Sequence, residues 1–195
     1  KEDIHSLFRE VANEKQIDFI VESHADIPEF IVTDRVRLEQ IIKNLLSNAF
    51  KFTPVNGRVI FRIKRQGKNI LFSNQFLVDT NEIIEFSVSY SGIGIPSEKQ
   101  ALIFEAFQQA DGSTSRKYGG TGLGLSISKM LVSMLGGEMQ LVSEQGVGST
   151  FYCYLPMSLS ESQGILNVSH ETTINTVRAR YKAVVKYNDD RNTIL

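Results

Sequence analysis

The feature that most constrains this chain is a strongly amphipathic segment from about Arg35 to Phe50, with Asp34 placed as its N-cap. Successive side chains lie about 100° apart around a helix, so one side of this segment is entirely apolar. That side holds Leu38, Ile41, Ile42, Leu45, Leu46 and Ala49. Such a helix is stable when its apolar side packs against another layer, which predicts a layered domain.

The polar side of the same helix has an unusual composition. Gln40, Asn44, Asn48 and Lys51 fall within an arc of about 80°. Asparagine is a poor helix former, yet two asparagines one turn apart place two amide oxygens on one line. Such oxygens suit Mg²⁺, and Lys51 would reach a phosphate. An ordinary solvated helix surface is the alternative, and this pattern alone does not decide between the two.

The remaining periodicities predict an α/β domain in which sequential strands are antiparallel neighbours. Helical spacing is found at 4–16, 97–107 and 122–135. Strand-like alternation is found at 17–21, 59–63, 70–72, 84–88, 138–143 and 149–155. A hairpin turn is predicted at 66–68, and 73–82 is interpreted as an inserted loop or a strand extension.

Composition excludes several classes of partner. The formal net charge of −1 gives no reason to expect nucleic acid or an acidic lipid surface. No stretch approaches the roughly 20 apolar residues of a membrane span, so we expect a cytoplasmic location, with a parent protein that is free to be membrane-anchored. The single cysteine, Cys153, excludes an intramolecular disulfide and is expected to be buried and inert.

Two glycine-rich segments add a second signal. One is 92–96, after a predicted strand, and the other is 119–125, before a predicted helix. Glycines allow backbone N–H groups to approach a ligand closely, and a helix N-terminus favours phosphate. One such segment is often only a tight turn. Two of them together with the asparagine helix indicate a phosphate ligand.

Taken in order, these elements resemble the catalytic domain of sensor histidine kinases, within the superfamily that includes DNA gyrase and mismatch-repair ATPases. Residues 37–53 resemble the N box of that family, residues 103–107 its F box and residues 120–125 its G2 box. The resemblance covers about residues 4–156. It implies a two-layer α/β sandwich with a mixed sheet, the Bergerat-type ATP-binding fold, with ATP beneath a flexible lid over 108–120.

The resemblance also implies roles for individual residues. Asn44 and Asn48 would hold Mg²⁺, and Lys51 would contact a phosphate. Arg116 and Lys117 would neutralise charge on the transferring phosphoryl group, so that Asn44, Lys51 and Arg116 form the catalytic set. The remaining expected nucleotide contacts are Tyr90, Gly92, Gly94, Ile95, Tyr118, Gly120, Gly122, Leu123 and Gly124. Tyr118 would cover the nucleotide or pack the lid, and Phe104 and Phe107 are expected to anchor the lid in the core.

One position departs from the family pattern. The family has Asp before its first glycine turn, where it accepts a hydrogen bond from the adenine amino group, and this chain has Tyr90 followed by Ser91. Loss of a charge-assisted hydrogen bond costs about 1.5–3 kcal/mol, or roughly 10 to 150-fold in affinity. ATP binding is then weak, or the domain is a pseudokinase, or Tyr90 swings aside and Ser91 reads adenine through a water. We favour weakened binding.

The chain carries no convincing phospho-accepting histidine. His5 and His24 lack the family's flanking residues, and His170, within Ser169–Glu171, lies downstream of the domain. We therefore divide the chain into a catalytic domain (1–156), a linker (157–191) and a possible start of a receiver domain (192–195), as in a hybrid kinase. The expected partners are a separate dimerisation domain with the acceptor histidine and a response-regulator receiver domain. The isolated domain is expected to be a monomer.

The function predicted from sequence is donation of the γ-phosphoryl of Mg-ATP to a histidine on another domain. A degenerate pseudokinase is the alternative. An ATP-driven clamp of the gyrase type is disfavoured, because that group has a catalytic Glu where this chain has Asn44.

We predict that this chain does not autophosphorylate, because no acceptor histidine lies in a suitable context. Incubation with γ-labelled ATP followed by acid- and base-stability analysis of the label is the measurement. Appearance of acid-labile phosphohistidine on the isolated chain would contradict the prediction.

Overall fold

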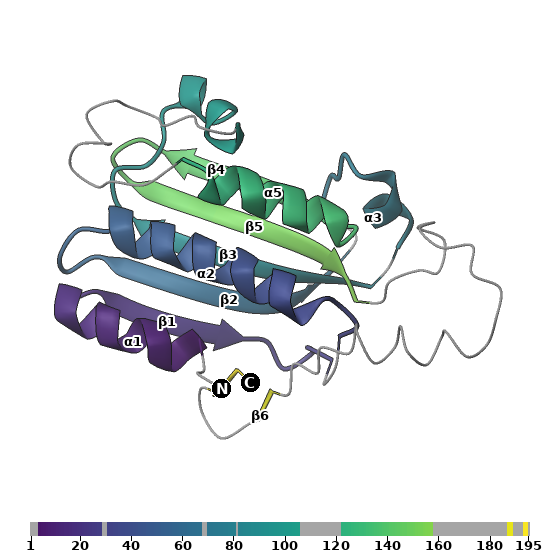
Figure 1. Cartoon of the computed structure of the whole chain (residues 1–195), viewed down its shortest axis with the longest axis horizontal. Coiled ribbons are helices and arrows are strands. Elements are labelled where there is room, and N and C mark those ends of the chain that lie inside the picture. Colours follow the sequence, from purple (N-terminus) through teal and green to yellow (C-terminus); the bar gives the residue numbers. More distant parts are fainter. Residues whose placement is uncertain are drawn as a thin grey trace.

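The computed structural model describes residues 4–28, 31–67, 70–80, 82–105, 122–157, 187–188 and 193–194. A five-stranded sheet in the order β1-β2-β3-β5-β4 forms one layer. Its strands are β1 (Asp18–Ser23), β2 (Arg58–Gln66), β3 (Ile83–Ser91), β4 (Glu138–Glu144) and β5 (Gly148–Pro156). Helices α1 (Ile4–Lys15), α2 (Arg35–Phe52) and α5 (Gly124–Met134) form the other layer, on one face of the sheet (Figure 1).

The sheet is mixed, and its one parallel pair corrects the expectation that all sequential strands are antiparallel. β1 pairs with β2 in parallel, whereas β2–β3, β3–β5 and β4–β5 are antiparallel. The reason is the connection: α2 lies between β1 and β2 in the chain, and a strand that returns through a helix enters the sheet in the same direction. β5 also lies between β3 and β4, so sequence neighbours are not always neighbours in space.

The core lies between the two layers and contains the residues predicted from helix periodicity. Ile41, Leu46 and Ala49 of α2 are completely buried, as is Val59 of β2. Cys153 is also fully buried, and burial raises the pKa of its thiol, which keeps the thiol in its neutral form. The amphipathic pattern of 35–50 is therefore confirmed as the main contact between the layers.

The connection between β2 and β3 differs from the prediction. Segment 70–72 is not a strand, and β2 pairs directly with β3 from Val59–Tyr90 to Gln66–Ile83, so a hairpin to 70–72 is wrong. A short helix, α3 (Gln75–Asp79), lies in the interval, capped by Asn74. The apolar residues mistaken for a strand pack in a small separate cluster on the other face of the sheet; its members are Ile70, Phe72, Leu77, Ile83, Tyr152 and Tyr154.

Three smaller results complete the comparison. The helix expected at 97–107 consists of two 3₁₀ turns, η1 (Ser97–Lys99) and η2 (Leu102–Phe104), and residues 106–107 lie outside the described part. Two short strands, β6 (Tyr187–Asn188) and β7 (Thr193–Ile194), pair with each other. No helix in the described ranges is long and apolar enough to cross a membrane. The division of the chain at 156 and 191 stays a prediction.

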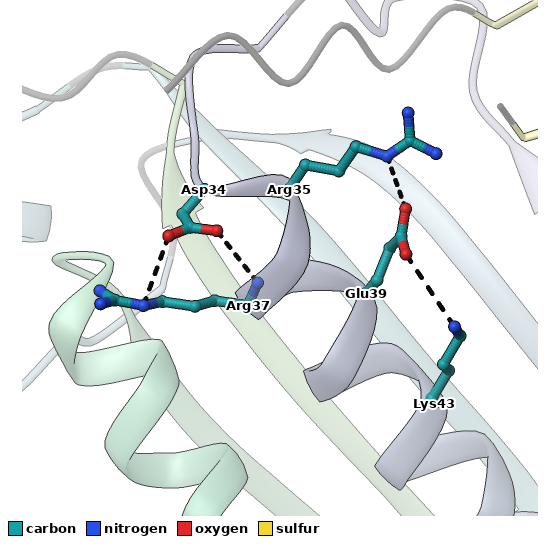
Figure 2. Close-up of polar contacts among 5 residues, drawn as sticks. All are labelled: Asp34, Arg35, Arg37, Glu39 and Lys43. Carbon is teal, nitrogen blue, oxygen red and sulfur yellow. Dashed lines mark hydrogen bonds and ion pairs between the residues drawn. The ribbon is translucent and has the colours of Figure 1, made fainter. Parts of the chain in front are cut away.

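The start of α2 is fixed by a cap and an ion-pair network (Figure 2). The Arg37 backbone N–H donates to Asp34 Oδ1 at 3.1 Å, and Arg37 Nε lies 3.4 Å from Asp34 Oδ2. Glu39 lies between Arg35 and Lys43 one turn away on either side. These side chains are partly exposed, so the ion pairs contribute little and the cap is the main stabilising contact.

We expect Asp34→Ala to lower the free energy of unfolding by about 1 kcal/mol, because the first turn of α2 loses its side-chain acceptor. For a domain of this size that corresponds to a melting temperature lower by about 2–4 °C. Asp34→Asn is the matched control, since it keeps a capping oxygen and removes only the charge. Equal losses for both variants in thermal unfolding would assign the effect to the ion pair instead.

Candidate functional site

The asparagine side of α2 meets the first turn of α5. Asn44 Nδ2 donates to the Gly124 carbonyl oxygen at 3.3 Å and to Ser128 Oγ at 3.2 Å. Ser128 Oγ itself donates to Gly124 O at 2.9 Å, and Ser128 is completely buried. Residues 80 positions apart in the chain are thus in direct contact. The two sequence signals for a phosphate ligand, the asparagine helix and the second glycine segment, converge at one place.

This contact also orients the Asn44 amide. Both hydrogen bonds that the Asn44 amide makes with described residues use its nitrogen. The oxygen Oδ1 is therefore the atom of this amide that can bind a ligand. Amide oxygens are suitable Mg²⁺ ligands, and Mg²⁺ completes its shell with waters and phosphate oxygens. No group of three or more His, Cys, Asp or Glu in the described part is placed to hold a metal. The Asn44 amide oxygen is of a kind that suits Mg²⁺.

Asn48 and Lys51 continue the same side of α2. Asn48 lies one turn after Asn44 and is half-buried. Lys51 is also half-buried, its ammonium lies 5.0 Å from the centre of the Phe52 ring, and burial lowers its pKa. A partly desolvated ammonium attracts an anion more strongly than a fully hydrated one does.

The first turn of α5 has the features of an anion site. Gly122 has φ of +71°, a conformation that favours glycine, and the N-cap residue Leu123 makes no side-chain capping bond. Among the described residues, a Cβ on Gly124 would meet nothing within 4 Å. The first backbone N–H groups of a helix have no partner within the helix, and they favour a negatively charged ligand.

The first glycine segment is held between α2 and the β4–β5 hairpin. Gly92 N donates to Val147 O at 3.1 Å, and Ile95 N donates to Ser143 Oγ at 2.8 Å. A Cβ on Gly92 would collide with the Phe52 carbonyl, and a Cβ on Gly94, at φ +60°, would collide with the Glu144 carbonyl. Gly92 is therefore required for close backbone packing against the C-terminal end of α2, and Gly94 for close packing against the end of β4, whatever ligand binds there.

Tyr90 is part of the core. Its side chain is only 7% exposed, and its ring is stacked on Phe151 with centroids 6.4 Å apart and an interplanar angle of 11°. Burial raises the pKa of the phenol, and the nearby Ser149 side chain lowers it by a smaller amount. Ser91 Oγ accepts the Arg58 backbone N–H at 2.9 Å. The structure therefore shows Tyr90 turned inward, and Ser91 Oγ accepts one hydrogen bond while its O–H can still donate.

Several predicted residues lie outside the described part: Arg116, Lys117, Tyr118, Gly120 and Phe107. Phe104 packs against the core, edge-on to Phe151, as expected for an anchor. Sequence reasoning missed Ser128 and Ser143. The sequence weakly indicated Ser128, since it lies one helical turn after Gly124. No sequence pattern indicated Ser143, because its contact with Ile95 depends on the β4–β5 hairpin.

Comparison with known proteins gives the family. Residues 33–159 match the family described as "Histidine kinase-, DNA gyrase B-, and HSP90-like ATPase". The chain belongs to this family. It is 41% identical over 160 residues to the autoinducer 2 sensor kinase/phosphatase LuxQ of Vibrio vulnificus, covering 82% of this chain and 18% of LuxQ. It is 36% identical over 159 residues to the histidine-protein kinase BarA of Escherichia coli, covering 82% of this chain and 16% of BarA. The chain thus spans less than a fifth of these relatives.

Solved structures agree with this family. The catalytic domain of the histidine kinase ThkA superposes with a TM-score of 0.61 at 28% identity, covering 80% of this chain and 90% of that domain. Full-length ShkA in complex with AMPPNP superposes with a TM-score of 0.59 at 31% identity, covering 82% of this chain and 31% of ShkA. The expected two-layer sandwich with a mixed sheet is confirmed.

We predict that Asn44→Ala weakens nucleotide binding in the presence of Mg²⁺ by roughly tenfold or more, because the amide oxygen expected to hold the metal is removed. Ser128→Ala is the matched control: it removes one partner of the Asn44 nitrogen and leaves the oxygen in place. Titration calorimetry with and without Mg²⁺ measures both. An Asn44→Ala protein that keeps its full Mg²⁺ dependence would refute the assignment.

Proposed function

We propose that this chain binds Mg-ATP between α2 and α5 and donates the γ-phosphoryl group to a histidine on a separate dimerisation domain. The observation that carries the proposal is the contact of Asn44 with Gly124 and Ser128. It supports a single site in which amide oxygens of α2 and backbone N–H groups of α5 face the same triphosphate. Membership of an ATPase family supports the nucleotide, and the ShkA complex contains AMPPNP.

The chemistry expected of these residues is positioning and charge neutralisation. Asn44 and Asn48 would hold Mg²⁺, which when bound neutralises phosphate charge. Lys51 would add a positive charge from α2, and the first turn of α5 would bind phosphate oxygens through Gly122, Leu123 and Gly124. Phosphoryl transfer requires little covalent participation from the protein, so correct placement accounts for most of the rate. Arg116 and Lys117 are proposed to act on the transferring group.

The partners are proposed on the same basis. A dimerisation domain would present the acceptor histidine, and a receiver domain would take the phosphoryl group onward. ThkA has been solved in complex with the response regulator TrrA, and it is 25% identical to this chain in that structure. Several relatives are named as sensor kinases, one as a hybrid histidine kinase of Dictyostelium discoideum. We propose a cytoplasmic location for this catalytic unit.

A second function is favoured by one specific observation. The buried Tyr90, stacked on Phe151, stands where the family has an adenine-binding Asp, which supports a degenerate domain with weak nucleotide binding and a role in docking or signal relay. The two functions differ in whether Mg-ATP binds at all. Titration of this chain with ATP, with and without Mg²⁺, separates them: Mg²⁺-dependent binding supports the kinase, and absence of binding supports the degenerate domain.

We predict that Tyr90→Asp tightens Mg-ATP binding by roughly 10 to 150-fold, because a charge-assisted hydrogen bond to the base becomes available. Calorimetric titration of both proteins is the measurement. Tyr90→Asn is the control, since it opens the same space without the charge and is expected to gain less. Equal affinities of the parent chain and Tyr90→Asp for Mg-ATP would refute this explanation of weak binding.

A further inference from the structure

The C-terminal turn of α2 lacks one of the backbone donors that a helix normally has. A helix carbonyl accepts the N–H of the residue four positions later, and for Phe50 that residue is Pro54, which has no N–H. The preceding carbonyl, that of Ala49, accepts twice, from Thr53 N at 3.0 Å and from Thr53 Oγ1 at 2.7 Å. Phe50 is buried, so its carbonyl needs a donor from elsewhere in the molecule.

The missing donor comes from Lys15, the last residue of α1. Helices α1 and α2 contact each other on the same face of the sheet (Figure 1). The Lys15 ammonium donates to the Phe50 carbonyl oxygen at 3.0 Å, although the two residues are 35 positions apart in the chain. A lysine at a helix C-terminus bonds to the last carbonyls and carries a charge opposite to that end of the helix dipole. Lys15 therefore caps α2 from a different helix.

The backbone beside Lys15 is bonded to the turn that follows α2. Gln16, at φ +53°, accepts the Asn56 backbone N–H at 2.9 Å through its carbonyl. Asp18 N donates to the Gly57 carbonyl at 2.9 Å. These two bonds fix the end of α1 relative to the end of α2, so the Lys15 side chain starts within reach of the carbonyl that it caps.

The capped turn carries Lys51, which directly follows Phe50 in the chain. The Phe50 ring is stacked on Phe8 of α1 with centroids 5.4 Å apart, and the Phe52 carbonyl lies against the Gly92 turn. Lys51 thus projects from a backbone that is held on both sides. Helix ends fray when their last carbonyls have no donors, so the bond from Lys15 helps to fix the place from which the Lys51 side chain starts.

We propose that Lys15 is a positioning residue for the nucleotide site: it holds the last turn of α2 so that Lys51 meets the triphosphate. This inference rests on the proposed function, in which Lys51 contacts a phosphate. Lys15 acts through the Phe50 carbonyl and is not itself a ligand contact. Removal of the cap frays the last turn, and Lys51 then loses the fixed placement on which binding and transfer of a phosphoryl group depend.

The test is titration calorimetry of the full 195-residue chain with Mg-ATP. Lys15→Met keeps an unbranched side chain without the donor, and we expect it to weaken binding by about fivefold, the factor that corresponds to loss of one helix cap. Lys15→Arg keeps a charged donor and is expected to stay within about twofold of the parent chain. Lys43→Met is the matched control, since it removes the same charge from a lysine that lies near Glu39, away from the last turn; it is expected to bind as the parent does.

A second background separates positioning from general stability. If Lys15 acts through Lys51, Lys15→Met has no further effect on Mg-ATP affinity in a chain that already carries Lys51→Met, because the two changes remove the same contact. Hydrogen exchange at the Thr53 amide, which donates to Ala49 in the same turn, reports the cap without any ligand. We expect faster exchange at this amide in Lys15→Met and parent-like exchange in Lys15→Arg.

The outcomes separate this inference from the proposed function. Equal affinities of the parent and Lys15→Met overturn the inference and leave the proposed function intact. An equal loss in Lys43→Met, or the same loss in the Lys51→Met background, also overturns it, since net charge or stability would then be the cause. Lys51→Met that binds Mg-ATP as tightly as the parent overturns it as well. If the parent binds no Mg-ATP, the proposed function fails and the inference fails with it. A loss confined to chains with Lys51, together with faster Thr53 exchange, supports the inference.

Discussion

The structure depends on the rotational setting of α2. Its apolar side is completely buried against the sheet, with Ile41, Leu46 and Ala49 showing no exposed surface. A rotation of one residue, about 100°, would move these side chains out of the core and Asn44 into it. Burial of the apolar side therefore fixes the direction in which the polar side of α2 faces. Core packing thus places Asn44 toward α5. The same helix thus packs the core and carries the polar residues of the proposed site.

The contact between Asn44 and α5 joins segments that are distant in sequence. Because the amide nitrogen bonds to Gly124 and Ser128, the oxygen is oriented before any ligand arrives. Preorganisation of this kind lowers the cost of binding, since a side chain need not lose rotamer freedom at that moment. Ser128 contributes without being a ligand, because it is buried beneath the contact and fixes the first turn of α5 by its bond to the Gly124 carbonyl.

The sequence predicted those parts of the fold that rest on local periodicity. The helix after Asp34, the helix that stops before Gly136–Gly137 and the strands β1 and β5 follow from spacing and caps. Local periodicity did not predict which strands pair, since the parallel β1–β2 pair depends on the path of the chain through α2. Segment 70–72 alternates like a strand but packs beside α3, because apolar residues at that spacing fit either structure. The inward position of Tyr90 depends on strand register, which no local pattern contains.

At Tyr90, core packing and the proposed recognition of a nucleotide base would compete for one position. A buried and stacked aromatic ring stabilises the ligand-free protein. A carboxylate at the same 7% exposed position would lose hydration and would need a partner. A nucleotide base would supply that partner only when it is bound, so an aspartate would destabilise the empty domain by its unpaired buried charge and regain that free energy on binding. Tyrosine causes no such destabilisation and gains no such free energy on binding. In the proposed nucleotide site, stability of the empty domain and recognition of the base would therefore be opposed at this residue, and tyrosine is the residue that favours stability.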